Sequence, residues 1–256
     1  MSAIDIMNNI KRVALIDGDV IAYKSSVAVQ KDIEWGDGLW TCHAYIGEAT
    51  VQAEAMIEGL TEDFDTVILA FSDSHNFRKD ILPTYKSNRV GKRKPTCYNG
   101  LVEWLKDRYT TYTFKNLEGD DVLGILATEP VVEEERVILS IDKDFKTIPS
   151  QFYDFGRDEL YHHTKNDALY WHMYQTLVGD VTDGYSGCPS YGDVKAKRLL
   201  ASVHPEEYWD AVVDAFKTRG LTEEDALVQA RVAHILHYGD YNKETGEVKL
   251  WTPKGN

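Results

Sequence analysis

Three short apolar runs, each followed by an aspartate, stand out in the hydrophobic and polar pattern of the chain. The runs cover residues 13–16, 66–71 and 136–141, and their continuity predicts buried strands. Strands that alternate with helices favour an α/β fold with a mostly parallel central sheet flanked by helices. The intervening segments with apolar positions at helical spacing are residues 20–31, 44–60 and 97–109.

The rest of the chain predicts shorter strands and then a run of helices. A turn at 36–38 predicts a hairpin between 32–35 and 39–43, and short strands are expected at 111–114, 152–155 and 160–163. Helices are expected at 166–178, 204–219 and 221–237, with a terminal hairpin at 242–251. We therefore expect an α/β core at 1–178 and a mainly helical region at 179–256.

Carboxylates follow each predicted strand of the core. Asp17 and Asp19 follow the first run, Asp73 the second, and Asp142 and Asp144 the third. A single such aspartate is usually a turn former or helix cap. Ligands of open parallel sheets bind at the carboxyl ends of the strands. The recurrence of aspartate there predicts one site along that edge.

Two further acidic groups border apolar segments: Glu118, Asp120 and Asp121 at a predicted helix start, and Asp180 with Asp183. The helix dipole accounts for one or two carboxylates at a helix start, but not for all. Two ionised carboxylates about 4 Å apart repel by roughly 4 kcal/mol at an effective dielectric constant of 20. Their convergence predicts a metal-dependent hydrolase, and all-oxygen ligands without His or Cys clusters indicate magnesium (Mg²⁺) or manganese (Mn²⁺).

Composition limits the class of protein. The 256 residues are 43% hydrophobic and 27% charged, which is typical of a globular domain. Three widely spaced cysteines fit a reducing compartment better than a disulfide framework. Residues 1–12 lack the apolar stretch of a signal peptide, and no apolar run is long enough to span a membrane. We expect a cytoplasmic protein without membrane contact.

The net charge of -14 argues against binding to nucleic acid, but the charge is segregated. One segment, about 76–95, holds seven basic residues against the single acidic Asp80, with Phe77 and Tyr85 between them. A solvated loop would explain an average charge run. Because this run follows an acidic strand end, we interpret it as a basic loop or arch that handles a polyanion. Its basic residues are Arg78, Lys79, Lys86, Arg89, Lys92, Arg93 and Lys94.

A glycine-containing turn follows the Asp180 group and leads into a predicted helix. Backbone amides freed by Gly187 and Gly192 at a helix N-terminus would bind phosphate without reading base sequence. Three basic side chains, Lys195, Lys197 and Arg198, reinforce this prediction.

The order of these motifs resembles the 5′-nuclease superfamily, which includes flap endonucleases and 5′-3′ exonucleases, and most closely its short bacteriophage exonucleases. The resemblance covers roughly residues 13–200. The matching motifs are Leu15-Ile-Asp17-Gly18, Phe77-Arg78 with Tyr85-Lys86-Ser-Asn-Arg89, Glu118-Gly-Asp120-Asp121, Ser140-Ile-Asp142-Lys-Asp144, and Gly179-Asp180 through Leu200.

The resemblance implies a PIN-like core, a basic arch and a helix-three-turn-helix that grips duplex DNA with a free 5′ end or flap. It implies a monomeric, DNA-hydrolysing enzyme that uses two metal ions, with the RNA of hybrids as a further expected substrate. The implied ligands are Asp17, Asp73, Glu118 and Asp120 for the first ion and Asp121, Asp142, Asp144, Asp180 and Asp183 for the second. The implied catalytic residues are Tyr85, Lys86, Arg89 and Lys24, and a potassium ion (K⁺) is implied at the turn of residues 185–191.

Several features depart from the family pattern. Ser72-Asp73-Ser74 replaces the usual Asp-Gly after the second strand, and the basic segment is short for a full helical arch. The choice between threading a flap and digesting a duplex end therefore stays open.

Two other functions explain part of the pattern. A haloacid-dehalogenase-type phosphatase would use Asp17 as its nucleophile, but that function leaves Glu118, Asp142 and the basic segment unexplained. A non-enzymatic DNA-binding module would use the carboxylates as helix caps and would bind DNA without metal.

Overall fold

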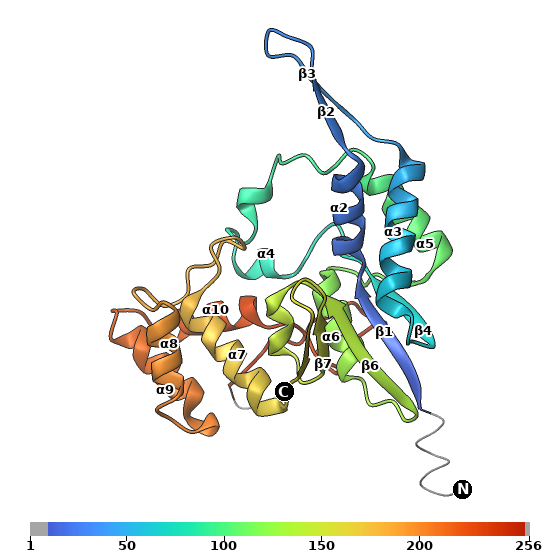
Figure 1. Cartoon of the computed structure of the whole chain (residues 1–256). Coiled ribbons are helices and arrows are strands. Elements are labelled where there is room, and N and C mark those ends of the chain that lie inside the picture. The colour runs from blue at the N-terminus through green and yellow to red at the C-terminus, as the bar shows by residue number, and fades with distance from the viewer. Residues whose placement is uncertain (1–9, 254–256) are drawn as a thin grey trace, which may run out of the picture.

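A six-stranded sheet runs through the centre of the protein in the computed structural model, which describes residues 10–253 (Figure 1). The strand order is β5-β4-β1-β6-β7-β8, and every neighbouring pair is parallel except β7 and β8. The predicted mostly parallel α/β fold is confirmed. The strands are β1 (Lys11–Asp17), β4 (Thr66–Ala70), β5 (Thr110–Tyr112), β6 (Glu134–Ser140), β7 (Gln151–Asp154) and β8 (Glu159–His162).

The apolar run of β1 is continuous because helices cover both faces of the sheet. Ala14 and Ile16 pack in one core with helices α2 (Gly18–Val29), α3 (Ile46–Thr61) and α5 (Tyr98–Arg108). Val13 and Leu15 point to the opposite face, where they share a core with α6 (Gly119–Thr128). The alternation of side chains along a strand thus feeds two cores from one segment.

Strands β2 (Lys31–Glu34) and β3 (Trp40–His43) form a separate antiparallel ribbon between α2 and α3. Figure 1 shows this ribbon projecting beyond both helices at the top of the molecule. The ribbon confirms the hairpin predicted from the 36–38 turn.

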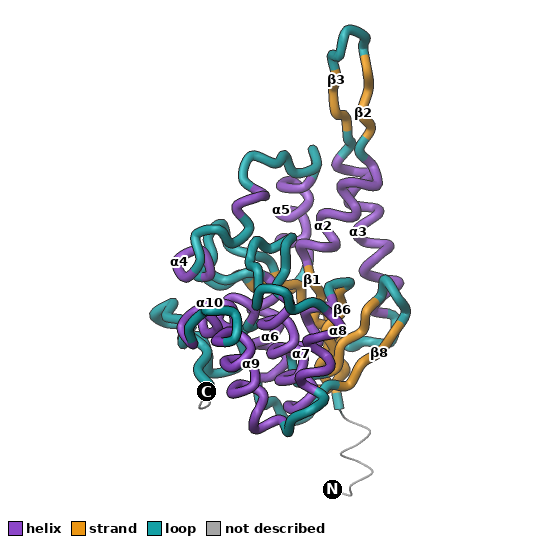
Figure 2. Tube along the Cα trace, turned by 90° about the vertical axis from the view of Figure 1, so that its left-hand side faces the viewer, coloured by secondary structure: helices purple, strands orange, loops and turns teal. Residues whose placement is uncertain are grey.

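Four helices form a second body, which lies beside the sheet in Figure 1 and faces the viewer in Figure 2. They are α7 (Lys165–Val178), α8 (Asp193–Leu200), α9 (Tyr208–Lys217) and α10 (Glu223–Ala233). Met173 and Leu177 of α7 share a buried cluster with Leu200 and Phe216 of the later helices. A boundary at residue 178 therefore cuts through this cluster, because α7 packs with the helical region.

Other predicted segments take shorter forms. The basic segment contains only the one-turn helix α4 (Arg78–Ile81) and the 3₁₀ turn η1 (Ser87–Arg89), with η2 (Lys143–Thr147) and η3 (Pro205–Glu207) elsewhere. At 242–251 the chain makes a turn closed by one bridge between Tyr241 and Val248, instead of the predicted hairpin strands. In the part of the chain that the structure describes, no helix is long and apolar enough to cross a membrane. The prediction about residues 1–12 lies mostly outside the described residues.

Helix α6 packs closely on the segment that follows α10. A Cβ atom on Gly124 would lie 2.4 Å from the backbone oxygen of Leu236 and 2.8 Å from Cγ2 of Ile235. Real Cβ atoms do not approach a backbone oxygen so closely. Glycine at this position therefore sets the distance between α6 and the C-terminal segment.

We expect Gly124→Ala to lower the free energy of unfolding by about 1–3 kcal/mol, because overpacking outweighs the roughly 1 kcal/mol gained in helix propensity. The matched control is Gly100→Ala in α5, where the new Cβ would lie 3.5 Å from the nearest atom, Cδ1 of Ile46. That control should stabilise the protein. Urea unfolding of both variants measures the effect, and equal shifts would contradict the close approach.

Candidate active site at the carboxyl edge of the sheet

Parallel pairing of β1 and β6 brings their acidic ends together. Asp17 ends β1 and caps α2 by accepting from the backbone N–H of Val20 (3.0 Å). The Ser140 hydroxyl at the end of β6 donates to Asp17 Oδ2 (3.0 Å), and Asp142 follows two residues later. Asp120 enters from the first turn of α6. Three elements that are distant in sequence thus meet at one edge of the sheet.

Burial and neighbouring carboxylates both raise the pKa values of acidic groups at this edge. Burial raises the pKa of Asp17 to about 7, and the charges of Asp19 and Asp142 add to the shift. Burial also raises the pKa of Asp120 well above its usual value, with Asp17 and Asp142 as further causes. The pKa of Asp144 is raised to about 7 by burial and then by Asp142. The charge of Asp142 therefore raises the pKa values of Asp17 and Asp120 on one side and of Asp144 on the other.

Asp180 and Asp183 extend the acidic group from the loop after α7. Both contribute to the raised pKa of Asp144, after burial and Asp142. Asp180 Oδ1 accepts from the backbone N–H groups of Thr182 (2.7 Å) and Asp183 (3.2 Å), which fixes this loop. Gln175 of α7 donates to Asp144 Oδ1 (2.5 Å), and this hydrogen bond connects α7 to the η2 turn that contains Asp144.

Basic and phenolic side chains bind one flank of the acidic group. Lys86 Nζ lies 2.6 Å from Glu118 Oε1 and 3.6 Å from Asp183 Oδ2, and Arg89 lies 2.6 Å from Asp183 Oδ1. The Tyr85 hydroxyl donates to Glu118 Oε2 (2.7 Å). Burial raises the pKa of Glu118, but Lys86 and Arg78 lower it to a net value below normal. The basic side chains therefore form ion pairs with Glu118 and Asp183. Among the described residues, Asp17, Asp120 and Asp144 form no such ion pairs.

The donor set suits hard divalent cations. Every candidate ligand here is a carboxylate oxygen, the type that Mg²⁺ and Mn²⁺ prefer. In residues 10–253, no three of these carboxylates have oxygens that all lie within 4.8 Å of one another. Such spacing is expected of ionised groups that repel, and water ligands would complete the shell of an ion between them. A bound cation would favour the ionised forms of these buried carboxylates, so the donor set fits a metal site.

Arg78 and Asp121 are not part of this site, so two predictions are wrong. The Arg78 guanidinium donates to both oxygens of Asp121, at 2.7 Å each, and to the backbone oxygens of Val232 (2.8 Å) and His234 (2.6 Å). Asp121 also accepts from the backbone N–H of Leu236 (3.1 Å). Both side chains are buried, so Arg78 cannot contact DNA and Asp121 cannot bind a metal ion at the sheet edge.

Asp73 lies at the margin of the acidic group. Hydrogen bonds from the backbone N–H groups of Asn116 (2.8 Å) and Ser74 (2.7 Å) lower the pKa of Asp73, and no acidic neighbour is among the causes. Asp19 lies closer to the cluster, since its charge raises the pKa of Asp17. Asp19 accepts from the Tyr98 hydroxyl (2.6 Å) and the Ser72 N–H (2.8 Å). The spacing Asp17-Gly18-Asp19 was the signal for this residue, which the predicted ligand set omitted.

Gly187 has a different role from the predicted one. Its N–H donates to Gln229 Oε1 (2.8 Å), so that amide is not available to a phosphate. Gly187 has φ +63°, and a Cβ there would lie 2.4 Å from the backbone nitrogen of Gly179. This glycine therefore permits close backbone packing, and its prediction as a phosphate ligand is wrong.

The other predicted DNA contacts lie on the surface. Gly192 is the exposed N-cap of α8; Lys195 donates to the Ser190 oxygen (3.1 Å) and Lys197 pairs with Asp193 (2.7 Å). The predicted catalytic residue Lys24 is exposed as well, and its Nζ lies 5.4 Å from the Phe155 ring centre. The remaining residues of this set with exposed side chains are Lys79, Lys92, Arg93, Lys94 and Arg198.

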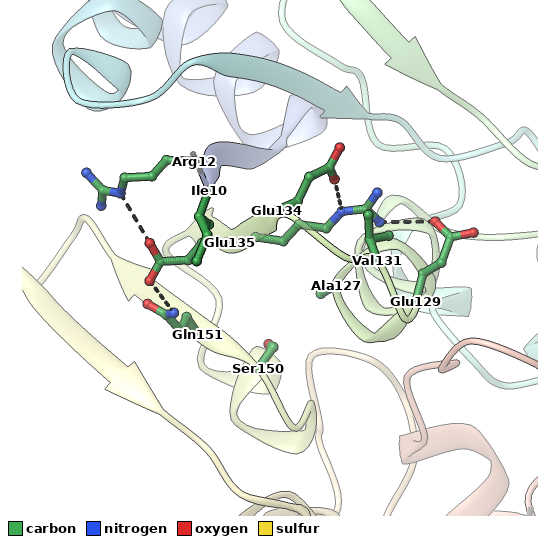
Figure 3. Close-up of a pocket in the computed structure, with 10 residues that line it drawn as sticks. Ile10, Arg12, Ala127, Glu129, Val131, Glu134, Glu135, Ser150 and Gln151 are labelled. Atoms are coloured by element: carbon green, nitrogen blue, oxygen red, sulfur yellow. Dashed lines mark hydrogen bonds and ion pairs between the residues drawn. The ribbon is translucent and has the colours of Figure 1, made fainter. Parts of the chain in front are cut away.

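A pocket of about 590 Å³ opens at the opposite edge of the sheet, near the start of β1 and β6 (Figure 3). Its charged groups pair with one another: Arg136 with Glu129 (3.1 Å) and Glu134 (2.8 Å), and Arg12 with Glu135 (3.5 Å). The pocket therefore lacks the uncompensated charge found at the carboxyl edge.

Comparisons with known proteins agree with this geometry. The family model for the 5′-3′ exonuclease N-terminal resolvase-like domain matches residues 12–165. The exodeoxyribonuclease of Enterobacteria phage T3 is 33% identical, over 95% of this chain and 94% of its own length. The exonuclease of Escherichia phage T7 is 32% identical over the same shares. The crystal structure of the T5 D15 protein with metal ions has a TM-score of 0.62 at 15% identity, covering 87% of this chain and 89% of that one, so the two share a fold.

We expect Arg78→Met to lower the free energy of unfolding by about 3–5 kcal/mol, because it leaves the buried Asp121 carboxylate unpaired. The neighbouring Lys79→Met is the matched control, since Lys79 is exposed, and it should change stability by no more than about 0.5 kcal/mol. Urea unfolding monitored by circular dichroism gives both values. Similar small effects of the two substitutions would contradict the proposed contribution of the Arg78–Asp121 pair to the free energy of unfolding.

The pKa of about 7 at Asp17 predicts a pH effect on the metal-free protein. The folded state holds a proton that the unfolded state loses near pH 4, so this group destabilises the fold as pH rises from about 4 to 7. Asp17→Asn keeps the cap acceptor but cannot ionise. We expect it to be more stable than wild type by roughly 2–4 kcal/mol at pH 8 and nearly equal at pH 4.

Asp73→Asn is the control for this experiment. Hydrogen bonds lower the pKa of Asp73, so its charge stabilises the fold above about pH 4 and its removal should destabilise the protein at pH 8. Denaturant unfolding with a chelator present, at several pH values, separates the two cases. Stabilisation by both variants, or by neither, would contradict the charge distribution described above.

Proposed function

The chain belongs to the 5′-3′ exonuclease family, and on that premise we propose that it is a divalent-metal-dependent nuclease that degrades duplex DNA from 5′ ends. Members of this family hydrolyse phosphodiester bonds. The observation that carries the proposal is the group of buried carboxylates around Asp142, which burial and neighbouring carboxylates both disfavour in the ionised form. The basic side chains of Lys86 and Arg89, here called the basic wall, lie next to this group.

Two groups of ligands share Asp142. Asp17, Asp19 and Asp120 with Asp142 would hold a first ion, and Asp144, Asp180 and Asp183 with Asp142 a second. Mg²⁺ or Mn²⁺ suits both groups, because all donors are carboxylate oxygens. When bound, a pair of such ions supplies a nucleophilic hydroxide and charge neutralisation for phosphoryl transfer. Glu118 lies between this group and the basic wall.

The basic wall would position the scissile phosphate. Lys86 and Arg89 pair with Glu118 and Asp183, and about half of the Arg89 side chain is exposed (49%). Arg89 can therefore turn to a phosphate oxygen at small cost and stabilise the charge that grows during cleavage. Tyr85, which donates to Glu118, holds that carboxylate in place. Lys24 lies over Phe155 near the end of β7 and is the fourth basic or phenolic residue that we assign to substrate positioning.

Exposed cations would bind the DNA backbone on both sides of the acidic edge. The basic segment carries Lys79, Lys92, Arg93 and Lys94. Helix α8, whose N-cap is Gly192, carries Lys195, Lys197 and Arg198. Because α7 and α8 flank the 179–192 loop, we propose that this region grips the duplex as a helix-three-turn-helix. Contacts of this kind position the duplex without reading its sequence.

The finer parts of the proposal concern substrates and ions. We propose a monomer that attacks duplex ends and flaps, and the RNA strand of hybrids. A K⁺ ion would bind carbonyl oxygens of residues 185–191, where the Ser190 oxygen already accepts from the Lys195 ammonium. That contact supports a preference for positive charge at this turn.

The test is digestion of end-labelled duplex, flapped and single-stranded DNA with Mg²⁺. Wild type should release short products from 5′ ends, and Asp142→Asn should lose about 10³-fold in rate, since it weakens both proposed ion sites. Asp19→Asn should lose at least tenfold, whereas the matched Asp73→Asn should stay within about threefold of wild type. Gel analysis of the products separates exonuclease from flap cleavage.

Two results would refute the proposal. One is hydrolysis of a generic phosphomonoester with every DNA substrate intact. The other is full activity of Asp142→Asn under conditions in which circular dichroism shows the same fold as wild type. A rate loss in Asp73→Asn equal to that in Asp19→Asn would reassign the first ion site alone.

A further inference from the structure

A compact group of metal-ligating side chains lies far along the sequence from the acidic motifs, in the segment after α10. His234, His237 and Asp240 each offer one ligand atom, and these three atoms all lie within 4.8 Å of one another. Within residues 10–253, no other set of three His, Cys, Asp or Glu residues meets this spacing. We propose that these residues form a second kind of metal site, for a zinc-like divalent ion.

One hydrogen-bonded turn holds the three residues together. The N–H of Asp240 donates to the His237 oxygen (3.0 Å), and the N–H of His237 donates back to Asp240 Oδ2 (2.9 Å). His234 Nε2 lies 3.2 Å from the same Oδ2 atom. The backbone therefore preorganises the site, so an ion has little chain entropy to overcome on binding.

The His237 ring contains an unexplained polar atom. Its Nε2 is buried and has no hydrogen-bond partner among the described residues. Buried polar atoms are nearly always satisfied, so such an atom calls for an explanation. The residues between the second and third ligands, Tyr238 and Gly239, are exposed. An ion could thus reach the site from solvent and bind this nitrogen.

The ligand set indicates the ion. Two imidazole nitrogens and one carboxylate oxygen form a set that Zn²⁺ accepts, with water in the fourth position, whereas Mg²⁺ prefers oxygen ligands. Ligand atoms about 2.1 Å from a tetrahedral ion lie about 3.4 Å apart, so the side chains here need to move by about 1 Å. The two sites of this protein would therefore select different metals by chemistry.

The position of the group indicates a structural role. The His234 oxygen accepts from Arg78 (2.6 Å), and the Leu236 N–H donates to Asp121 (3.1 Å). The His172 ring of α7 lies 5.1 Å from the His234 ring, so α7 packs against the group. An ion here would fix the segment whose backbone completes the buried Arg78–Asp121 pair. We therefore infer that it stabilises the junction between the sheet and the helical region.

A simpler explanation is a metal-free hydrogen bond between His234 and Asp240. That bond accounts for His234 and Asp240, but it leaves the buried Nε2 of His237 without a role. The two explanations differ in whether the wild-type protein binds zinc in the presence of excess Mg²⁺.

The experiment strips the protein with a chelator and titrates Zn²⁺ by calorimetry, and Co²⁺ by visible absorption, in excess Mg²⁺. We expect one equivalent of Zn²⁺ that Mg²⁺ does not displace, the intense absorption of tetrahedral Co²⁺, and a rise in Tm on adding Zn²⁺. His237→Ala should lose all three. The matched control His162→Ala, an exposed histidine on β8, should keep them.

Asp240→Asn guards against a folding defect, because an amide oxygen keeps the acceptor for both histidines while the charge is lost. It should bind Zn²⁺ at least tenfold more weakly. Wild-type protein that takes up no Mg²⁺-resistant Zn²⁺, or a folded His237→Ala that still binds the full equivalent, would overturn the proposal. All three readouts are independent of nuclease activity, so failure of the proposed function would leave this test intact.

Discussion

The buried ion pair of Arg78 and Asp121 is the constraint on which the site depends. A guanidinium taken out of water must find partners for its N–H groups, and here the partners come from two distant parts of the chain. Asp121 belongs to α6, and the Val232 and His234 oxygens follow α10 or end it, 154 to 156 residues after Arg78. One side chain thus fixes the basic segment, the acidic helix start and the C-terminal segment relative to one another.

Fixing these segments decides how charge is shared at the sheet edge. Arg78 leads into Tyr85 and Lys86, and the Lys86 N–H donates to the Asp183 oxygen (2.7 Å), with Lys86 itself at φ +51°. The basic segment is thereby pressed onto the 183–184 loop, where a Cβ on Gly184 would lie 2.5 Å from the Thr84 oxygen. Lys86 and Arg89 then form ion pairs with Glu118 and Asp183, whereas Asp17, Asp120 and Asp144 form none among the described residues. The uncompensated charge is a product of this packing.

The sequence predicts the sheet well because the signal is local. A continuous apolar run such as 13–16 favours a strand covered on both faces, because it is too short for a helix, and an aspartate that follows such a strand lies at its carboxyl end. Partner choice is not local. Nothing in the composition of the basic segment distinguishes Arg78, which pairs with a residue 43 positions away, from exposed Lys79. At the second strand end, Asp73 accepts from the backbone N–H of Asn116, a partner 43 positions away that no local pattern indicates.

The histidine group shows the same limit from the other side. The predicted helix at 221–237 would place His234 and His237 one turn apart on a helical surface. Two histidines in that arrangement do not by themselves indicate a metal site. In the structure the helix ends at Ala233, because the next residues turn back to donate to Asp121 and accept from Arg78. The buried pair ends the helix, and the resulting turn gathers His237 and Asp240 around His234. The buried pair that orders the acidic edge therefore also assembles His234, His237 and Asp240. Within residues 10–253 this is the only group of three metal-ligating side chains with this spacing.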